Sequence, residues 1–230
     1  MDLLIKSLYN PNEKESKPDA NLGLVTLKVN DIQPEVLSYN WLFVTDRSGS
    51  MDASTSFVNM KTSKLDALKH TMRKMFEYFY KDAKDRGAIH NVVITLFDHE
   101  SNNLCMKITK DTIIQEYYNI IQEISSGGMT NMFKGIELAS KEIDKLPNGK
   151  TVMVLLSDGE ITCGIKCMDT IAETMFEASN NNRSMFSYRI VGYGADHSVK
   201  LLSHLAKKTG GEYHCIESVE GCLLYTSDAA

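Results

Sequence analysis

Residues 46–50 read Asp-Arg-Ser-Gly-Ser and place one carboxylate and two hydroxyls on a short segment. Oxygen ligands of this kind, here Asp46, Ser48 and Ser50, are those that small hard cations prefer. The segment follows a continuous apolar run at residues 41–45, which is typical of a buried strand, so a loop at the end of that strand is expected. By itself the pattern is weak, because a chain of this length contains it by chance about 6% of the time. A polar strand-to-helix turn is the ordinary alternative.

Two further segments carry oxygen ligands at comparable places. Residues 126–130 read Ser-Gly-Gly-Met-Thr and precede an expected helix, whereas residues 157–160 read Ser-Asp-Gly-Glu and follow the apolar run 152–156. Each has an ordinary explanation, since Thr130 is a suitable helix N-cap and Asp158 is a suitable residue of an Asp-Gly turn. If the strands before these loops are parallel, however, the loops meet at the carboxyl edge of one sheet, where ligands of such folds bind.

The elements that must position these loops alternate along the chain. Strands are expected at residues 41–45, 92–97, 104–109, 152–156, 186–192 and 211–216. Helices are expected over residues 65–79, 113–124, 132–145 and 198–208, with another before residue 186. This alternation predicts an α/β fold with a doubly wound, mostly parallel central sheet and helices on both faces. The strand at residues 104–109 follows its predecessor after a short loop, so it is expected to be an antiparallel edge strand.

The order Asp-x-Ser-x-Ser, Thr, Asp on loops that share one sheet edge resembles the metal-ion-dependent adhesion site of the von Willebrand factor A-type domain. The resemblance covers roughly residues 38–221 and includes the Ser-Gly-Gly-Met-Thr-Asn and Val-Leu-Leu-Ser-Asp-Gly segments. It implies a Rossmann-like fold in which the two serines bind Mg2+ directly, the threonine directly or through water, and the two aspartates mostly through water. The implied ligands are Asp46, Ser48, Ser50, Thr130 and Asp158.

This division of ligands has a chemical consequence. Mg2+ requires six oxygens in octahedral array and gives up water reluctantly, so hydroxyl ligands with outlying carboxylates leave the ion electrophilic and open to an outside ligand. An Asp or Glu of a protein partner can take that position, and Mn2+ or Ca2+ are alternatives to Mg2+. The predicted function is therefore metal-dependent binding of an acidic residue of a protein. Gly49 and Gly128 are expected to let the loops approach the ion, and Ser50 to open a helix within a few residues.

Two alternatives use the same ligands. A Mg2+-dependent hydrolase would need a positioned base, and among the six histidines only His99 is expected at the site edge, beside Asp98. A scaffold with a purely structural metal would be stabilised by the ion without binding a partner. We expect no enzymatic activity, and we expect Asp98 to face solvent as most loop carboxylates do.

Composition argues against several other classes. A net charge of -5 and a pI near 5.7, without a basic patch, disfavour nucleic acid as a partner. No signal sequence or membrane-length apolar stretch is visible, and five cysteines without framework spacing fit a reducing compartment. A cytoplasmic location without membrane insertion is therefore expected. Cys163 and Cys167 could form half of a zinc site, but no second pair completes it, and ordinary thiols are the simpler interpretation.

The chain is expected to begin and end with segments outside the α/β domain. Residues 1–20 are polar and contain prolines, as in a mobile arm, and residues 21–37 hold an accessory edge strand and a linker. Residues 38–221 form the α/β domain, whose last helix begins near residue 217 and is expected to be incomplete. Residues 222–230 resemble the translation of a transposon-end adapter used in sequencing libraries, so a non-native tail is expected there.

Overall fold

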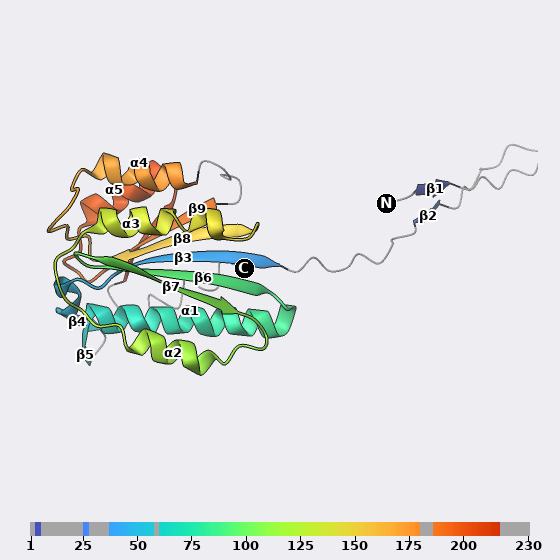
Figure 1. The fold of residues 1–230 in the computed structure, drawn as a ribbon, viewed down its shortest axis with the longest axis horizontal. Coiled ribbons are helices and arrows are strands. Elements are labelled where there is room, and N and C mark those ends of the chain that lie inside the picture. Colours follow the sequence, from blue (N-terminus) through green and yellow to red (C-terminus); the bar gives the residue numbers. More distant parts are fainter. Residues whose placement is uncertain (1–2, 6–24, 28–36, 58–59, 180–185, 217–230) are drawn as a thin grey trace, which may run out of the picture. The chain divides into compact units, whose positions relative to one another are not determined.

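The computed structural model describes residues 3–5, 25–27, 37–57, 60–179 and 186–216 (Figure 1). Contacts divide the chain into two units, Met1–Glu35 and Val36–Ala230. In the first unit, β1 (Leu3–Ile5) pairs antiparallel with β2 (Val25–Leu27) in a sheet of its own. The accessory strand is therefore not an edge of the larger sheet. The rest of the expected arm, the incomplete last helix and the expected non-native tail lie outside the described residues.

The second unit is built on a six-stranded sheet with the order β10-β9-β8-β3-β6-β7. Its strands are β3 (Ser38–Asp46), β6 (Ile89–Phe97), β7 (Ser101–Ile108), β8 (Lys150–Ser157), β9 (Phe186–Tyr193) and β10 (Glu212–Ile216). Neighbouring strands are parallel except at β7, which runs antiparallel to β6 at one edge. The predicted doubly wound, mostly parallel sheet with an antiparallel edge strand is confirmed. The winding reverses at β3, between β8 and β6, so the end of β3 is where such folds bind ligands.

Helices cover both faces of this sheet (Figure 1). The first face carries α1 (Lys64–Arg86) and α2 (Ile114–Gln122), and the second carries α3 (Met132–Ser140), α4 (Met168–Ala178) and α5 (Val199–Thr209). The helix expected over residues 132–145 is divided, because the 3-10 helix η2 (Ile143–Lys145) follows α3 as a separate turn. Within the described residues, no helix has both the length and the apolar character needed to pass through a lipid bilayer.

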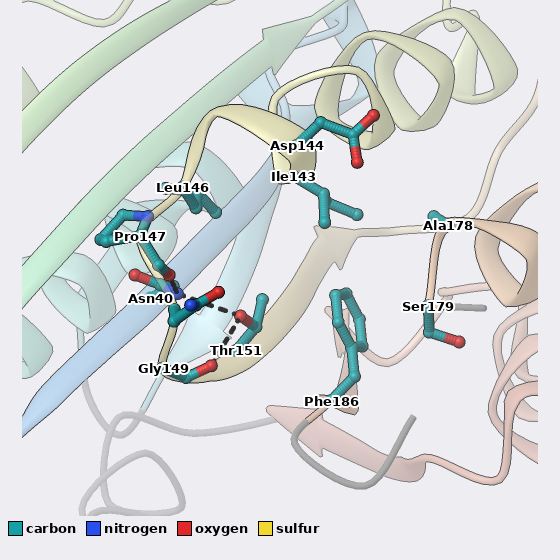
Figure 2. Close-up of a pocket in the computed structure, with 11 residues that line it drawn as sticks. Asn40, Ile143, Asp144, Leu146, Pro147, Gly149, Thr151, Ala178, Ser179 and Phe186 are labelled. Atoms are coloured by element: carbon teal, nitrogen blue, oxygen red, sulfur yellow. Dashed lines mark hydrogen bonds between the residues drawn. The ribbon is translucent and has the colours of Figure 1, made fainter. Parts of the chain in front are cut away.

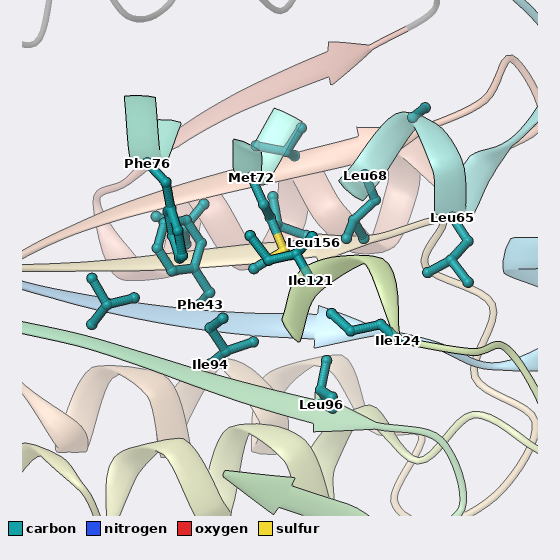
Figure 3. Packing of buried hydrophobic residues seen from close by; sticks show 14 of the residues in the cluster. Phe43, Leu65, Leu68, Met72, Phe76, Ile94, Leu96, Ile121, Ile124 and Leu156 are labelled. Carbon is teal, nitrogen blue, oxygen red and sulfur yellow. The ribbon is translucent and has the colours of Figure 1, made fainter. Parts of the chain in front are cut away.

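Side chains of β3 alternate between two apolar layers, one on each face of the sheet. Phe43 packs in the layer shared with α1 and α2, together with Phe76 and Ile121 (Figure 3). Leu42 and Val44 pack in the opposite layer, which is shared with α3, α4 and α5. Because both faces are covered, the strand is apolar at successive positions, which explains the continuous run in the sequence. The same packing fixes the end of β3, where the first candidate loop begins.

The chain between β3 and α1 differs from the prediction. Ser50 lies in the 3-10 helix η1 (Gly49–Asp52), and an antiparallel hairpin of β4 (Ser54–Phe57) and β5 (Met60–Ser63) separates this turn from α1. The expectation that Ser50 opens the following helix is therefore wrong. The N-cap of α1 is Ser63, whose Oγ accepts the backbone N–H three residues further on at 3.0 Å. This bond satisfies one of the free donors of the first turn, so the helix begins there.

Candidate metal centre

The carboxyl edge of the sheet brings the first and third candidate loops together. Thr45 pairs with Leu156 in the parallel register, so Asp46 at the end of β3 lies beside Ser157 at the end of β8. The Ser157 hydroxyl donates a hydrogen bond to Asp46 Oδ2 at 2.5 Å. Asp158 follows directly and is fully buried, as Asp46 is. Two aspartates from distant parts of the sequence are therefore neighbours at this edge.

Backbone hydrogen bonds join the second loop to the first. Gly127 N–H donates to Arg47 O at 2.9 Å. In return, Gly49 N–H donates to Gly128 O at 3.1 Å. Gly128 has a φ of 74°, in the left-handed region, and a Cβ there would lie 2.4 Å from His99 Nδ1. Glycine satisfies both constraints, so the close approach expected of Gly128 has a geometric basis.

Thr130 lies two residues beyond Gly128 and is held by the loop that follows β8. Its backbone N–H donates to Thr162 Oγ1 at 2.7 Å, and its carbonyl accepts from the N–H groups of Thr162 and Cys163, each at 3.2 Å. The residue is 2% exposed. The N-cap of α3 is Asn131, whose side chain accepts a backbone N–H of the first turn. The alternative explanation of Thr130 as that cap is therefore wrong.

The hydroxyls of the first loop have the spacing of adjacent cation ligands. Ser48 Oγ and Ser50 Oγ are joined by a hydrogen bond and lie 3.1 Å apart. Two neighbouring oxygens that bind Mg2+ in octahedral array at ~2.1 Å are about 3.0 Å apart. Ser48 is fully buried and Ser50 is half-buried, so the pair has its more accessible side at Ser50. The distance between these two oxygens is therefore compatible with adjacent ligands of a small hard cation.

Asp46 holds the first loop in place through both carboxylate oxygens. Oδ1 accepts the Ser48 N–H at 2.9 Å, and Oδ2 accepts the Ser157 hydroxyl. Burial raises the pKa of Asp46 to about 6; hydrogen bonds from Ser157 and Ser48 oppose this rise, and the charge of Asp158 adds to it. Desolvation is the largest cause, so the surroundings of Asp46 disfavour its charged form. A divalent cation near this carboxylate would favour the charged form.

Asp158 is engaged by three groups from different elements. Its Oδ1 accepts the Glu160 N–H at 3.2 Å, and its Oδ2 accepts a hydrogen bond from Lys64 Nζ at 3.1 Å. Its backbone carbonyl accepts the Ser198 N–H at 2.7 Å. Lys64 is therefore a part of this centre that sequence reasoning missed. The available signal is its helical spacing of four from Leu68 on the buried face of α1, which its charge obscures.

Asp98, at the end of β6, departs from its expected exposure. The residue is 7% exposed, its Oδ2 lies 3.0 Å from Arg47 Nε, and its Oδ1 accepts the Glu100 N–H at 2.7 Å. Its carbonyl also accepts the Asn131 N–H at 2.7 Å. The expectation that Asp98 faces solvent is therefore wrong, because this residue ties the first loop to the start of α3. His99 is exposed, and its Nδ1 lies 3.0 Å from Asp98 Oδ1.

The chemistry of the centre depends on hydroxyls as much as on carboxylates. Within the described part of the chain, no group of three or more His, Cys, Asp or Glu side chains is arranged to hold a metal. Two carboxylates, two serine hydroxyls and a threonine instead come from three loops at one edge. A set of neutral hydroxyls with few carboxylates would suit Mg2+ that keeps some of its water, and it would leave positive charge on such an ion.

A pocket of about 260 Å³ lies at the amino ends of the central strands, opposite the carboxyl ends that carry the candidate ligands (Figure 2). Asn40, Thr151 and Phe186 line it from the starts of β3, β8 and β9. The buried Asn40 donates through Nδ2 to Pro147 O at 2.9 Å and to Thr151 Oγ1 at 3.2 Å, and its Oδ1 accepts from Asn91 Nδ2 at 3.0 Å. These bonds join strand starts, whereas the candidate ligands lie at strand ends. The pocket is therefore separate from the candidate centre.

A doubly wound sheet with oxygen-bearing loops at its carboxyl edge defines the class of Rossmann-like α/β domains. The family model of the von Willebrand factor type A domain matches residues 41–160, and the chain belongs to this family. That family commonly mediates protein–protein interactions. The chain is 33% identical over 100 residues to the uncharacterized protein YwmC of Bacillus subtilis (strain 168), and these residues make up 43% of this chain. The match spans 41% of the length of that curated relative.

Solved structures share the fold at low sequence identity. The minor pilin PilB from Streptococcus sanguinis is 14% identical with a TM-score of 0.66, and the match covers 99% of this chain and 76% of that one. The conserved hypothetical protein BatB from Bacteroides thetaiotaomicron is 13% identical with a TM-score of 0.60, and the match covers 84% of this chain and 97% of that one. A von Willebrand factor type A protein from Catenulispora acidiphila is 18% identical with a TM-score of 0.56, and the match covers 81% of this chain and 40% of that one.

Proposed function

We propose that this domain binds a divalent cation, Mg2+ foremost, and uses the ion to bind an acidic residue of a protein partner. The ligands we assign to the ion are Asp46, Ser48, Ser50, Thr130 and Asp158. The observation that carries the proposal is the pair of serine hydroxyls 3.1 Å apart, on a loop that is held by the fully buried Asp46 carboxylate. When bound, the cation supplies a Lewis-acidic position for an oxygen ligand from outside the chain.

The chain's own groups explain why the outside ligand would be acidic. Both oxygens of Asp46 accept hydrogen bonds within the loops, and Oδ2 of Asp158 accepts one from a lysine. Neither carboxylate is free to neutralise the ion fully, so positive charge remains for a carboxylate of the partner. We assign the domain as a binding module without catalytic activity. The cytoplasmic location stays a prediction.

A hydrolase is the second candidate, because His99 Nδ1 lies 3.0 Å from Asp98 Oδ1 at the rim of the centre. A histidine paired with a carboxylate is the usual arrangement of a general base. Asp98, however, also binds Arg47 and the Glu100 N–H, which is the behaviour of a loop anchor. Hydrolysis of p-nitrophenyl phosphate with Mg2+ that is lost in His99→Ala would favour the hydrolase over the binding module.

The test of the binding module is a Mn2+ titration followed by partner capture. Wild-type protein is expected to bind Mn2+, and Ser48→Ala is expected to lower the affinity at least about tenfold because one direct ligand is lost. Ser140→Ala is the matched control, since its hydroxyl bonds Ile136 O within α3. Immobilised domain should then capture an acidic partner from lysate with Mg2+ or Mn2+, and Asp46→Ala should abolish capture without unfolding the domain. Equal capture in excess EDTA would remove the proposal.

A further inference from the structure

Lys64 is a buried lysine at the first position of α1, and the residue is 2% exposed. Two general preferences oppose this placement. The amino end of a helix carries partial positive charge, which disfavours a cation in the first turn. Lysine is also almost never fully buried unless it is paired. A residue that goes against both preferences is expected to be retained by a specific partner.

The partners of Lys64 are two carboxylates of unequal burial. Its Nζ lies 3.1 Å from Asp158 Oδ2 and 2.9 Å from Asp196 Oδ1. The Asp158 side chain is 0% exposed, whereas that of Asp196 is 67% exposed. Water screens the exposed pair, so it contributes little, but removing one member of the buried pair would leave an uncompensated charge. Asp158 is therefore the partner that matters energetically.

The loop between β9 and α5 is shaped around this lysine. Gly194 has a φ of 85°, and a Cβ there would lie 2.7 Å from Lys64 Cε. The absence of a side chain at this position lets the lysine stem pass along the loop to reach Asp158. The Ser198 N–H of the same loop donates to the Asp158 carbonyl at 2.7 Å. Both the charge and the backbone of Asp158 thus depend on contacts with α1 and this loop.

We propose that Lys64 is an internal counter-ion of the centre: its ammonium group compensates Asp158 when no cation is bound and opposes a cation that is bound. The first half concerns the metal-free fold alone, and the second half rests on the proposed function. Lys64 donates to the same carboxylate that we assign to the ion, so the two positive charges share one negative partner. The cation is therefore held weakly enough to exchange, and it keeps charge for an acidic ligand.

The first test is a double-mutant cycle on the full chain in EDTA. Lys64→Met is expected to lower Tm by about 10 °C, because it leaves Asp158 buried without a counter-charge. Adding Asp158→Asn should recover at least about half of that loss, since a neutral amide needs no counter-ion. Additive losses in the double variant would overturn the counter-ion role. If Lys64→Met alone does not fold, a folded double variant supports the proposal and an unfolded one contradicts it.

The second test is Mn2+ affinity, measured from the electron paramagnetic resonance signal of free Mn2+. Lys64→Met should bind Mn2+ about tenfold more tightly than wild type, because a repelling charge is removed, and Lys64→Arg should bind as wild type does. Lys69→Met is the matched control: Lys69 is buried on the same helix, but its Nζ donates to Gln122 O. Its loss should lower Tm without changing Mn2+ affinity. Unchanged or weaker binding by Lys64→Met would overturn the second half.

A variant of the exposed partner separates the two carboxylates that contact Lys64. Asp196→Asn should change Mn2+ affinity by less than about threefold, because water screens the exposed pair. A change as large as that of Lys64→Met would show that Asp196 is the partner that matters, and would count against the proposal. The two failures are also separable: absence of Mn2+ binding by wild type defeats the proposed function, whereas the cycle in EDTA still decides whether Lys64 compensates Asp158.

Discussion

Gly128 shows how strongly a single position constrains the candidate centre. Its φ of 74° suits glycine, and a Cβ would lie 2.4 Å from His99 Nδ1 and 3.4 Å from Asp98 Cβ. Its carbonyl accepts the Gly49 N–H, so a shift of this residue would move the loop that carries both serines. The conformation and the close contact act together, and the loop pair depends on both.

Gly128→Ala is expected to lower the free energy of unfolding by about 2–4 kcal/mol, because backbone strain is added to a steric overlap. Mn2+ affinity should fall as well, since the serine pair would lose its position. Gly87→Ala is the matched control: its φ is 70°, but nothing lies within 4 Å of the added Cβ. That variant should cost only about 1 kcal/mol and leave Mn2+ affinity unchanged. Urea unfolding and a Mn2+ titration measure both quantities, and equal costs for the two variants would contradict the argument.

The candidate ligands could be selected from the sequence because each follows an apolar run or precedes a helix, and the fold class fixes where such positions meet. The structure places Asp46, Ser48 and Asp158 in buried positions on that edge. Their role as metal ligands stays a prediction. Lys64 could not be selected in this way, since a lysine near a helix start reads as a surface residue. The room for its side chain depends on Gly194, and its buried partner is Asp158, and both are distant in the sequence.

At the scale of elements, α1 is joined to the sheet by a buried histidine. His90 on β6 is 1% exposed and stacks on Phe79 of α1, with ring centroids 4.8 Å apart. Trp41 Nε1 donates to His90 Nδ1 at 3.1 Å, so Nδ1 is the unprotonated nitrogen. The Nε2–H then donates to Asp82 Oδ2 at 3.1 Å. This arrangement requires the neutral imidazole, because protonation of Nδ1 would break the bond from tryptophan.

The stability of the domain is therefore expected to depend on the charge of His90. Burial lowers its pKa below the ordinary 6.5, and Asp82 only partly opposes this. Below about pH 6.5 the unfolded chain takes up a proton that the folded chain does not, so stability falls as the pH falls. The full contribution is present above pH 6.5, and the loss is at most about 1.4 kcal/mol per pH unit. Urea unfolding between pH 7.5 and 5 in EDTA measures this slope.

The control for this prediction is His90→Gln, which keeps a polar side chain but does not titrate. Asp46 acts in the opposite direction, because its raised pKa of about 6 makes the folded chain bind the extra proton between pH 3.8 and 6. The contribution of Asp46 is the same in wild type and in His90→Gln. The difference in slope between wild type and His90→Gln therefore isolates the histidine, and equal slopes would show that His90 does not titrate as argued.

Elements with strong local signals could be predicted, and those defined by the surrounding structure could not. The strand at residues 41–45 was predictable because burial on both faces requires a continuous apolar run. The hairpin of β4 and β5 was missed, since residues 54–63 are mostly polar and lack a period-two apolar pattern. The end of α3 was overestimated, because the apolar spacing continues into η2 although the helical backbone does not.

At the scale of the whole domain, three exposed apolar side chains belong to segments whose backbone contacts the candidate centre. Among the described residues, the large hydrophobic side chains that are exposed are Leu37, Ile113, Met129, Ile165, Phe176 and Val199. Met129 precedes Thr130, and Val199 follows Ser198, whose N–H bonds the Asp158 carbonyl. Ile165 lies on the loop that binds Thr130 through residues 162 and 163. A partner that presents a carboxylate to the ion would thus meet apolar side chains on more than one loop.

This arrangement predicts the kind of peptide that the domain selects. Random peptides displayed on phage and panned on the immobilised domain in Mn2+ should converge on an Asp or Glu with apolar neighbours, and the enrichment should disappear in EDTA. The combined variant Met129→Ser, Ile165→Ser, Val199→Ser should bind the selected peptides about tenfold more weakly, because apolar contact area is lost while the ion is untouched. Its Mn2+ affinity should equal that of wild type.

The matched control is Ile113→Ser, since Ile113 is 64% exposed but precedes α2, after β7 has run back from the carboxyl edge. Its exposed fraction is larger than that of Met129, Ile165 or Val199, so a general effect of surface hydrophobicity would appear in this variant too. Unchanged peptide affinity in Ile113→Ser and weaker affinity in the combined variant would place the contact surface around the centre. Wild-type affinity in both variants would mean that the carboxylate binds alone and that Met129, Ile165 and Val199 contact nothing in the bound peptide.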